Sequence, residues 1–263
     1  MSIKFLYDRQ KIAVTYGEQK ISYADVIKYV NFYSDFLDIE KGDRSALMME
    51  NRPESIFSFF SIWAKKGIAI SLDAGYTVDQ LAYVLGDSEP KYLFVSNKTK
   101  QVAEEANSKL NNAVKIINVD EIDLPTDYKI KQEEFANDSN KDVAVLVYTS
   151  GTTGNPKGVM ITYENIETNM AGVRAVDLVN ENDVILAMLP YHHIMPLCFT
   201  LILPMYMGVP IVLLTEISSA TLLKTLQENR VTVILGVPRV WEMLDKAIMT
   251  KINQSSLAKF MFR

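Results

Sequence analysis

Short apolar runs alternate with amphipathic segments along most of the chain. The runs at 12–16 and 20–23 flank Gly17-Glu18, which predicts a β-hairpin. After Ser22 the apolar residues recur at helical spacing, so Ser22 is the expected N-cap of a helix. Beyond that helix, the pattern predicts strands at 45–49, 68–72, 92–95 and 114–119, and helices at 53–66, 77–85 and 99–110.

The second half of the chain repeats this alternation after a break. Residues 121–140 are polar, contain Pro125 and lack periodicity, so we expect a linker there. Residues 143–148 are almost wholly apolar, which is typical of a strand in the middle of a parallel sheet. The pattern then predicts strands at 184–188, 210–214 and 231–235, and helices at 163–176, 196–207, 221–228 and 238–249.

Regular strand–helix alternation predicts an α/β fold with two mostly parallel sheets flanked by helices. We expect a first α/β subdomain over residues 1–120, a linker over 121–140 and a second α/β subdomain over 141–263. A single doubly wound sheet is the alternative. The pattern does not complete an obvious domain at Arg263, so we expect the sequence to be a fragment of a longer protein.

Composition narrows the class of protein. With 48% hydrophobic and 22% charged residues among 263, the chain resembles an ordinary folded protein and is neither disordered nor fibrous. A net charge of −5 without a basic patch argues against a nucleic-acid partner. The one cysteine, Cys198, excludes a disulfide framework and a cysteine-based zinc site. The first residues lack a secretory apolar region, so we expect a cytoplasmic protein.

Residues 184–215 contain no Asp, Glu, Lys or Arg, and a run of roughly 20 apolar residues could span a membrane. Five breakers interrupt the run, so we expect a buried strand, a buried helix and a second strand instead. Peripheral contact with a membrane surface stays open as an alternative. The breakers are Pro190, Pro196, Pro204, Gly208 and Pro210.

The segment with the clearest chemistry reads Tyr148-Thr-Ser-Gly-Thr-Thr-Gly-Asn-Pro-Lys-Gly-Val-Met160. Its glycines let the backbone bring successive N–H groups close to an anion, and its hydroxyls add donors. Lys157 supplies a compact positive charge. This combination indicates a phosphate-binding loop, with a surface turn rich in Ser, Thr and Gly as the alternative. The spacing fits neither the Walker A loop nor the dinucleotide fingerprint, which disfavours a kinase-like protein.

This segment resembles the phosphate-binding signature of the adenylate-forming (AMP-binding) superfamily, which includes acyl-CoA synthetases, peptide-synthetase adenylation domains and luciferases. Resemblance to acyl-CoA synthetases is traceable through residues 13–249. It is carried further by Met160-Ile-Thr-Tyr-Glu-Asn-Ile, by Leu189-Pro-Tyr-His-His-Ile-Met-Pro-Leu and by Val237-Pro-Arg-Val-Trp-Glu-Met-Leu, the last being similar to long-chain acyl-CoA synthetases.

The resemblance implies a two-step reaction. A carboxylate attacks the α-phosphate of ATP, giving acyl-adenylate and pyrophosphate, and a thiol, usually that of coenzyme A, then takes the acyl group. It therefore implies ATP, Mg²⁺ and coenzyme A, with a fatty acid or other carboxylic acid as substrate. Thr149 matches a hydroxyl that helps to place Mg²⁺. The residues implied to hold the β- and γ-phosphates are Thr149, Ser150, Gly151, Thr152, Thr153, Gly154 and Lys157.

His193 matches a histidine that the family places near the reacting carboxylate, so the resemblance implies a catalytic role. A core histidine with a satisfied ring is the alternative. Adjacent side chains on a strand or helix point in different directions, so His192 and His193 are not expected to form a metal site.

Apolar residues around this motif are candidates for a fatty-acyl tunnel, with ordinary core packing as the alternative. Methionine suits a flexible ligand because its side chain adapts. Some long-chain enzymes place a gating tryptophan where Leu197 aligns, and this departure argues against strict long-chain gating. The candidates are Leu197, Phe199, Leu201, Met195, Met205 and Met207.

Several parts of the family's catalytic set do not occur in residues 1–263: a later Gly-Tyr-Gly-x-Thr-Glu segment, a ribose-binding Asp and a C-terminal domain with an essential Lys. The resemblance therefore implies an N-terminal fragment of an ATP-dependent fatty acid–CoA ligase, which we expect to be inactive alone. The alternatives are an acyl-ACP synthetase, an aryl-acid–CoA ligase or a non-catalytic nucleotide-binding module. A homodimer is also left open.

Overall fold

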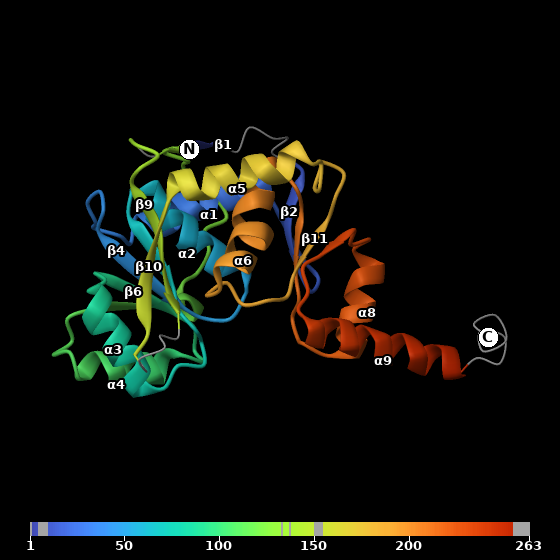
Figure 1. Cartoon of the computed structure of the whole chain (residues 1–263). Helices are drawn as coiled ribbons and strands as arrows, with labels where there is room; N and C mark the ends of the chain where they lie inside the picture. The colour runs from blue at the N-terminus through green and yellow to red at the C-terminus, as the bar shows by residue number, and fades with distance from the viewer. Residues whose placement is uncertain (1, 5–9, 133, 137, 150–154, 255–263) are drawn as a thin grey trace.

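The computed structural model describes residues 2–4, 10–132, 134–136, 138–149 and 155–254. Within these residues the strands form two large sheets and a small two-stranded one (Figure 1). The first large sheet has six strands in the order β10-β9-β5-β4-β6-β7. They span Lys157–Thr162 (β10), Val143–Thr149 (β9), Ile68–Ser71 (β5), Arg44–Met48 (β4), Tyr92–Val95 (β6) and Lys115–Asn118 (β7).

The second large sheet has five strands among the described residues, in the order β13-β11-β12-β2-β3. All neighbouring strands of both sheets run parallel except at the β9–β10 and β2–β3 hairpins. Two mainly parallel sheets flanked by helices confirm the predicted fold class. The strands of this sheet are Val233–Ile234 (β13), Ile185–Ala187 (β11), Ile211–Leu213 (β12), Ile12–Tyr16 (β2) and Gln19–Ser22 (β3).

Each large sheet takes strands from both sides of residues 121–140. The N-terminal hairpin β2–β3 joins the five-stranded sheet because Val14 pairs with Ile211 of β12. The hairpin β9–β10 joins the six-stranded sheet because Ala69 of β5 pairs with Val145. The sheets therefore do not coincide with the two segments expected along the sequence, and the subdomain boundaries stay a prediction.

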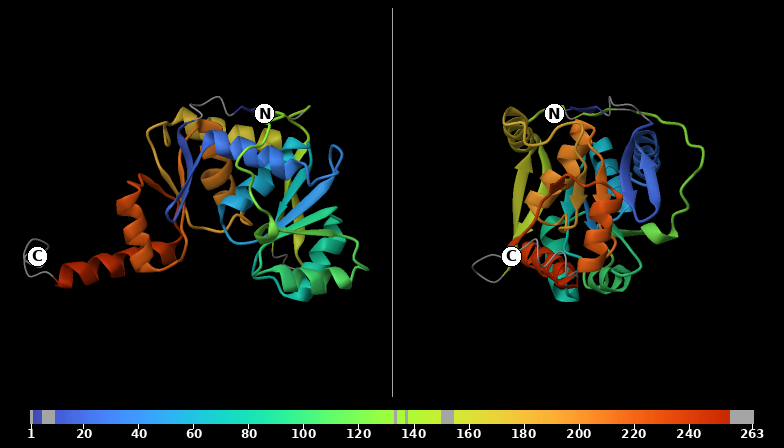
Figure 2. Two further views of the ribbon diagram at one scale, coloured as in Figure 1. Left: turned by 180° about the vertical axis from the view of Figure 1, so that it is seen from behind. Right: turned by 90° about the vertical axis from the view of Figure 1, so that its right-hand side faces the viewer.

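Helices form three layers around the two sheets (Figure 2). One continuous apolar core joins the inner faces of both sheets to a central layer of helices. Within that layer, α2 is apolar almost all round, as expected for a helix covered on every side. Its Trp63 indole donates a 2.9 Å hydrogen bond to the carbonyl of Ala144 in β9. The central layer contains α1 (Tyr23–Ser34), α2 (Pro53–Ala64), α5 (Tyr163–Ala175) and the segment 194–207.

Two outer layers cover the remaining faces. Apolar residues of the six-stranded sheet pack against α3 (Val78–Ser88) and α4 (Lys100–Ser108). Apolar residues of the five-stranded sheet pack against α8 (Ser219–Glu228) and α9 (Pro238–Gln254). The far end of α9 extends away from the rest of the described chain (Figure 1). Side chains alternate between the inner and outer cores along these strands, which is the period of two expected for a covered sheet.

The uncharged run at 184–215 folds as predicted into a strand, a helical segment and a strand. The helical segment is divided into α6 (Ile194–Pro196), the wider turn η2 (Leu197–Ile202) and α7 (Leu203–Met207). Pro204 cannot donate to the carbonyl of Thr200, and the Tyr191 hydroxyl lies 3.5 Å from that carbonyl instead. Across the described parts of the chain, every helix is too short or too polar to cross a membrane.

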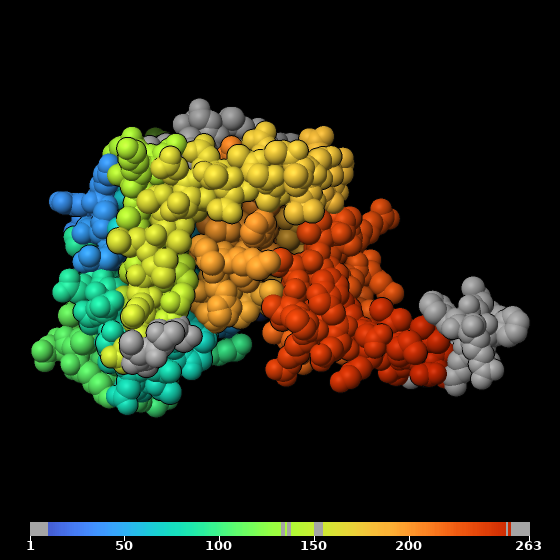
Figure 3. Space-filling view, viewed as in Figure 1, coloured from blue at the N-terminus to red at the C-terminus, as the bar shows by residue number. Residues whose placement is uncertain are grey.

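The sequence analysis did not predict two of the observed strand pairings, β1 with β8 and β9 with β10. Strand β1 (Ser2–Lys4) pairs antiparallel with β8 (Glu134–Ala136), which lies in the segment expected to be a linker. Strand β10 begins at Lys157, inside the segment 148–160 that was expected to be a loop, and continues to Thr162. Val159 and Met160 of β10 are exposed, so this edge strand lacks the apolar pattern that marks a buried one. Figure 3 shows β10 on the surface beside α5.

Candidate active site

The phosphate-loop prediction falls on the β9–β10 hairpin. Thr149 ends β9 and Lys157 begins β10, and the two residues are paired across the strands. Both side chains are exposed. The hairpin therefore places one hydroxyl and one ammonium group opposite each other at the end of the sheet. The other five predicted phosphate ligands, Ser150, Gly151, Thr152, Thr153 and Gly154, lie outside the described residues.

The sheet register relates Thr149 to a carboxylate. Strand β9 runs parallel to β5, with Ala69 opposite Val145. Strand β5 ends at Ser71, two residues before Asp73, and β9 ends at Thr149. Because the carboxyl ends of parallel strands meet at one edge of a sheet, that edge brings together the end of the hairpin and Asp73. Ligands of open α/β sheets bind along such an edge.

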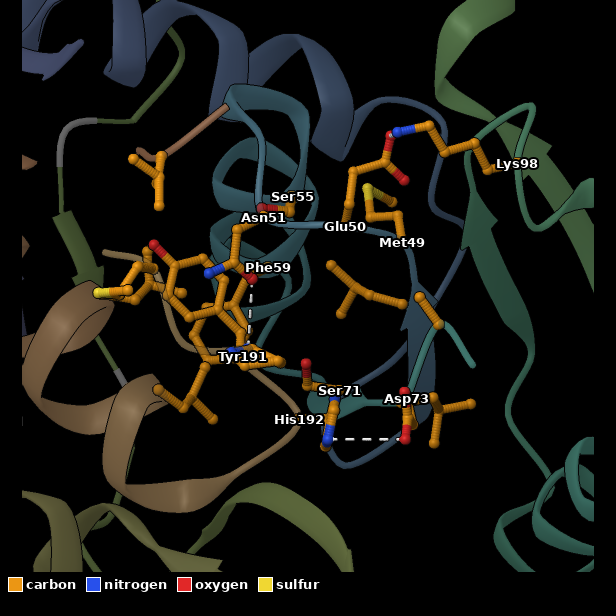
Figure 4. A pocket seen from close by; sticks show the side chains of 18 of the residues that line it. Met49, Glu50, Asn51, Ser55, Phe59, Ser71, Asp73, Lys98, Tyr191 and His192 are labelled. Carbon is orange, nitrogen blue, oxygen red and sulfur yellow. Dashed lines mark hydrogen bonds and ion pairs between the residues drawn. The ribbon is translucent and has the colours of Figure 1, made fainter. Parts of the chain in front are cut away.

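A cavity of about 280 Å³ lies between the two large sheets at this edge (Figure 4). Its wall combines residues that follow β4, β5 and β6 of the six-stranded sheet with residues that follow β11 and β12 of the five-stranded sheet. The segment 194–207 contributes Leu197 and Leu201 to the wall. The cavity is therefore built by both sheets, and neither half of the sequence could form it alone.

The cavity has an apolar side and a polar side. Leu47, Phe59, Leu197, Leu201 and Leu214 supply much of the apolar surface. Polar groups gather on residues just past the strand ends, where Lys98 Nζ lies 3.3 Å from Glu50 Oε1. An apolar pocket with a few convergent polar groups is the usual form of a small-molecule site. The polar and titratable side chains of the wall include Glu50, Asn51, Ser55, Ser71, Asp73, Lys98, His192 and Glu216.

Of the two histidines, His192 is the one that lines the cavity. Its Nε2 lies 3.8 Å from Oδ2 of Asp73, so side chains from the two sheets meet there (Figure 4). Burial lowers the pKa of His192 below its usual value, while the charge of Asp73 acts in the opposite direction. At neutral pH this favours the uncharged ring. The neighbouring ring of His193 is 4.0 Å away between centroids and also lowers the pKa of His192.

His193, the predicted catalytic residue, lies on the other side of this turn. Its side chain is exposed, and it is absent from the described wall of the cavity. Its N–H donates to the carbonyl of Pro190 at 3.3 Å, and its carbonyl accepts from Leu197 at 3.1 Å. His193 is therefore fixed by its backbone at the start of α6, and its exposed side chain is not part of the described cavity wall.

The acyl-tunnel candidates divide by position. Leu197 and Leu201 line the cavity, whereas Met205 is fully buried in the core. Met195 is 55% exposed, so it does not contribute to an enclosed wall within the described structure. Cys198 lies beside Leu197, and burial raises the pKa of its thiol to about 11, which keeps it protonated at neutral pH.

Sequence reasoning missed most of the polar wall. Each of the missed residues lies within about four positions after the end of a predicted strand, and that position was the available signal, since such residues face the ligand edge of a parallel sheet. Among the described residues, no group of three or more His, Cys, Asp or Glu side chains could hold a metal ion. The missed residues are Glu50, Asn51, Asp73, Lys98 and His192.

The fold of the chain is similar to that of solved CoA synthetases. The o-succinylbenzoate–CoA synthetase of Bacillus subtilis, solved with its acyl-adenylate intermediate, superimposes with a TM-score of 0.78 at 24% identity over 90% of this chain and 61% of that chain. ATP-bound MatB from Rhodopseudomonas palustris superimposes with a TM-score of 0.79 at 23% identity over 97% of this chain and 52% of that chain. At such identities these matches describe the fold.

The sequence also matches the family model described as AMP-binding enzyme over residues 7–262. The chain belongs to the AMP-binding enzyme family, as its loop signature indicated.

Curated relatives of the chain are CoA ligases for several kinds of acid. A long-chain-fatty-acid–CoA ligase of Bacillus subtilis (strain 168) is 24% identical over 88% of this chain and 48% of the relative. A 2-succinylbenzoate–CoA ligase of Bacillus velezensis is 31% identical over 78% of this chain and 40% of the relative. The chain thus spans half or less of the length of these curated relatives.

Proposed function

We propose that the protein is part of an ATP-dependent acid–thiol ligase that activates a fatty acid as acyl-adenylate and transfers it to coenzyme A. The observation that carries the proposal is the cavity at the carboxyl edge of both sheets. Its apolar side, with Leu197 and Leu201, suits an acyl chain. Its wall includes residues that follow β4 and β5, at the same carboxyl edge of the six-stranded sheet at which Thr149 ends β9.

In this proposal the β9–β10 turn holds the β- and γ-phosphates of ATP. Lys157 contributes its charge, and Thr149 contributes its hydroxyl together with the hydroxyls and amides of Ser150, Gly151, Thr152, Thr153 and Gly154. Both described side chains are exposed and face the same end of the hairpin, which supports access by a triphosphate. Charge that develops on the reacting phosphate is stabilised electrostatically by such donors.

Magnesium and coenzyme A belong to the same proposal. Mg²⁺ prefers oxygen ligands and keeps several waters and substrate phosphates, so it needs few protein ligands. The exposed hydroxyl of Thr149 fits that requirement. When bound, the ion neutralises phosphate charge. Coenzyme A would supply the thiol that accepts the acyl group.

His193 is the proposed catalytic residue. Its ring lies 4.0 Å from that of His192, which lines the cavity, and it directly precedes the segment that carries Leu197, so it lies next to the cavity wall. A ring at this place can orient the reacting carboxylate by hydrogen bonding.

An aryl or otherwise polar carboxylic acid is the second candidate substrate. The polar wall of the cavity, with Asp73, Lys98 and His192, favours a substrate that carries polar groups besides its carboxylate. Relatives that act on 2-succinylbenzoate support the same alternative.

Trapping of acyl-adenylates by hydroxylamine, in the full-length protein, tests both candidates. A panel of saturated fatty acids of increasing length is compared with aryl and dicarboxylic acids at equal concentration. Formation of fatty acyl hydroxamates above the level of the aryl acids supports the first proposal. Exclusive use of aryl or amino acids contradicts it, and no hydroxamate with any acid contradicts the ligase assignment itself.

A further inference from the structure

The two sheets are joined at the cavity by one side-chain amide. Asn51 follows β4 of the six-stranded sheet, and its Nδ2 donates a 2.8 Å hydrogen bond to the carbonyl of Leu189. Its Oδ1 accepts from the N–H of Tyr191 at 3.3 Å (Figure 4). Leu189 and Tyr191 follow β11 of the five-stranded sheet. The side-chain amide of Asn51 thus forms hydrogen bonds with the residues before and after Pro190.

The backbone at this turn needs such a partner. Strand β11 ends at Ala187, so Leu189 and Tyr191 lie beyond its ladder with a carbonyl and an N–H to satisfy. Pro190 between them has no N–H and cannot extend the ladder. Asn51 presents a donor and an acceptor at the spacing of a neighbouring strand, and therefore replaces the missing backbone partner.

Asn51 is itself held on a rigid support. The preceding Glu50 accepts a 2.8 Å hydrogen bond from the Ser96 hydroxyl. The following Arg52 binds Glu54 at 2.7 Å and Asp120 at 2.8 Å, and Pro53 begins α2 directly after it. These contacts on both sides fix the backbone at Asn51. The side-chain amide of Asn51 therefore has a fixed position, and its hydrogen bonds fix the 189–191 turn in the same way.

We propose that Asn51 is a positioning residue that sets the orientation of His192 and His193 relative to the cavity. The turn that it grips leads directly into both histidines, and the His193 N–H is bonded back to Pro190 within the same turn. The 3.8 Å contact between His192 and Asp73 is a second link between this turn and the six-stranded sheet. This inference rests on the proposed function in one respect, the role of the two histidines in adenylation.

Replacement of Asn51 by leucine tests the inference because it removes both hydrogen bonds without changing any charge. The histidine rings are isotope-labelled in the full-length protein, and the signals of His192 and His193 are assigned from His192→Gln and His193→Gln. In Asn51→Leu, the loosened turn should let water reach His192. Its titration midpoint by NMR should then rise toward the ordinary value for histidine, because less of the desolvation that lowers it remains.

The charged and titratable groups facing His192 stay in place in this variant. They are Asp73 and His193 in direct contact, and Glu50, Lys98, Glu216, Tyr16 and Tyr191 elsewhere in the cavity wall. A changed midpoint therefore reports a changed position or hydration of the ring.

Asn31→Leu is the matched control. Asn31 makes the same kind of two-sided grip on another turn, donating to the carbonyl of Gln132 at 2.8 Å and accepting from Lys131 and Gln132 at 3.0 Å. Its loss should lower stability and leave both histidine titrations unchanged. If Asn51→Leu does not fold, Asn51→Ala takes its place with the same expected shift.

Unchanged titration of both histidines in a folded Asn51 variant overturns the inference, and so does an equal change in Asn31→Leu. Hydroxamate formation is measured in parallel: kcat should fall at least tenfold in the Asn51 variant, with little change in the KM for ATP. If the unmodified protein forms no adenylate, the proposed function fails, while the NMR result still decides the role of Asn51.

Discussion

At the scale of single residues, position on a strand decides which groups can meet. Thr149 and Lys157 are separated by a turn in the sequence, yet pairing of β9 with β10 places them opposite each other. His192 and His193 are adjacent, yet one lines the cavity and the other is exposed. The residue types of the motifs indicated phosphate and carboxylate chemistry, whereas the choice between the two histidines depended on a turn that Asn51 holds from the other sheet.

Lys157→Ala should weaken ATP binding by about tenfold to a hundredfold, since a hydrogen bond to a charged group contributes about 1.5–3 kcal/mol. AMP binding should change much less, because the proposed contacts are to the β- and γ-phosphates. Calorimetric titration with both nucleotides measures the difference. Lys20→Ala, which removes an exposed lysine from β3, should change neither affinity. Equal loss of ATP and AMP affinity in Lys157→Ala would contradict the proposed contact.

At the scale of elements, local signals located helices more reliably than edge strands. Ser22 caps α1 as predicted, with the N–H of Asp25 bonded to its hydroxyl at 3.1 Å. Strand β10 escaped prediction because its apolar residues Val159, Met160 and Ile161 are consecutive and do not alternate with polar ones. The same strand leads directly into α5, so the helix start fixes one end of the hairpin that carries the phosphate loop.

Thr162→Ala should lower the free energy of unfolding by about 1 kcal/mol, the usual cost of losing an N-cap. Thr162 accepts from the N–H of Asn165 at 3.2 Å, and Asn165 accepts from the N–H of Thr162 at 3.0 Å, which together form a capping box at α5. Denaturation by urea measures the change.

The matched control for this cap is Thr168→Ala, the same substitution at an exposed position within α5. Its stability should stay equal or rise slightly, because alanine is the better helix former. Equal destabilisation by both substitutions would show that the cap adds nothing.

At the scale of the whole molecule, the site exists because two sheets meet. The central helices bury apolar surface against both sheets in one core, and this holds the carboxyl edges close enough to enclose the cavity. His192 and Asp73 face each other across that junction. Because His192 is titratable and lies where the two sheets meet, the stability of the packed sheets depends on pH.

The free energy of unfolding should fall as the pH is lowered from 7.5 to 5.5. The pKa of His192 is lower in the folded protein than its ordinary value of about 6.5, so the unfolded chain binds more protons in this range. The contribution is complete above pH 6.5 and is lost as the pH falls toward the folded pKa. Urea denaturation across this range should show a flatter dependence for His192→Gln.

The pH dependence of the unmodified protein can be compared with that of His192→Gln because the carboxylates with shifted pKa values titrate below this pH range. The pKa values of Asp25 and Glu50 lie below their usual range. Desolvation raises the pKa of Asp25, but its hydrogen bonds with Lys28 and Ser22 outweigh this effect. Desolvation also raises the pKa of Glu50, but its hydrogen bonds with its own backbone and with Ser96 outweigh it. Their stabilisation is present above about pH 4 and is lost only as the pH falls further. An unchanged slope in His192→Gln between pH 7.5 and 5.5 would therefore remove His192 as its source.

The sequence by itself determined the order of most strands and helices, the fold class and the family, because periodicity, caps and the loop signature are local properties of the chain. Tertiary structure decided the rest: the hairpin β2–β3 joined a sheet built from residues about 200 positions away, and β10 became a strand by pairing with β9. It also turned His192 toward the cavity and brought Asn51 to Leu189. Such contacts join residues distant in the chain, and their energy exists only once both sheets have packed on their shared core.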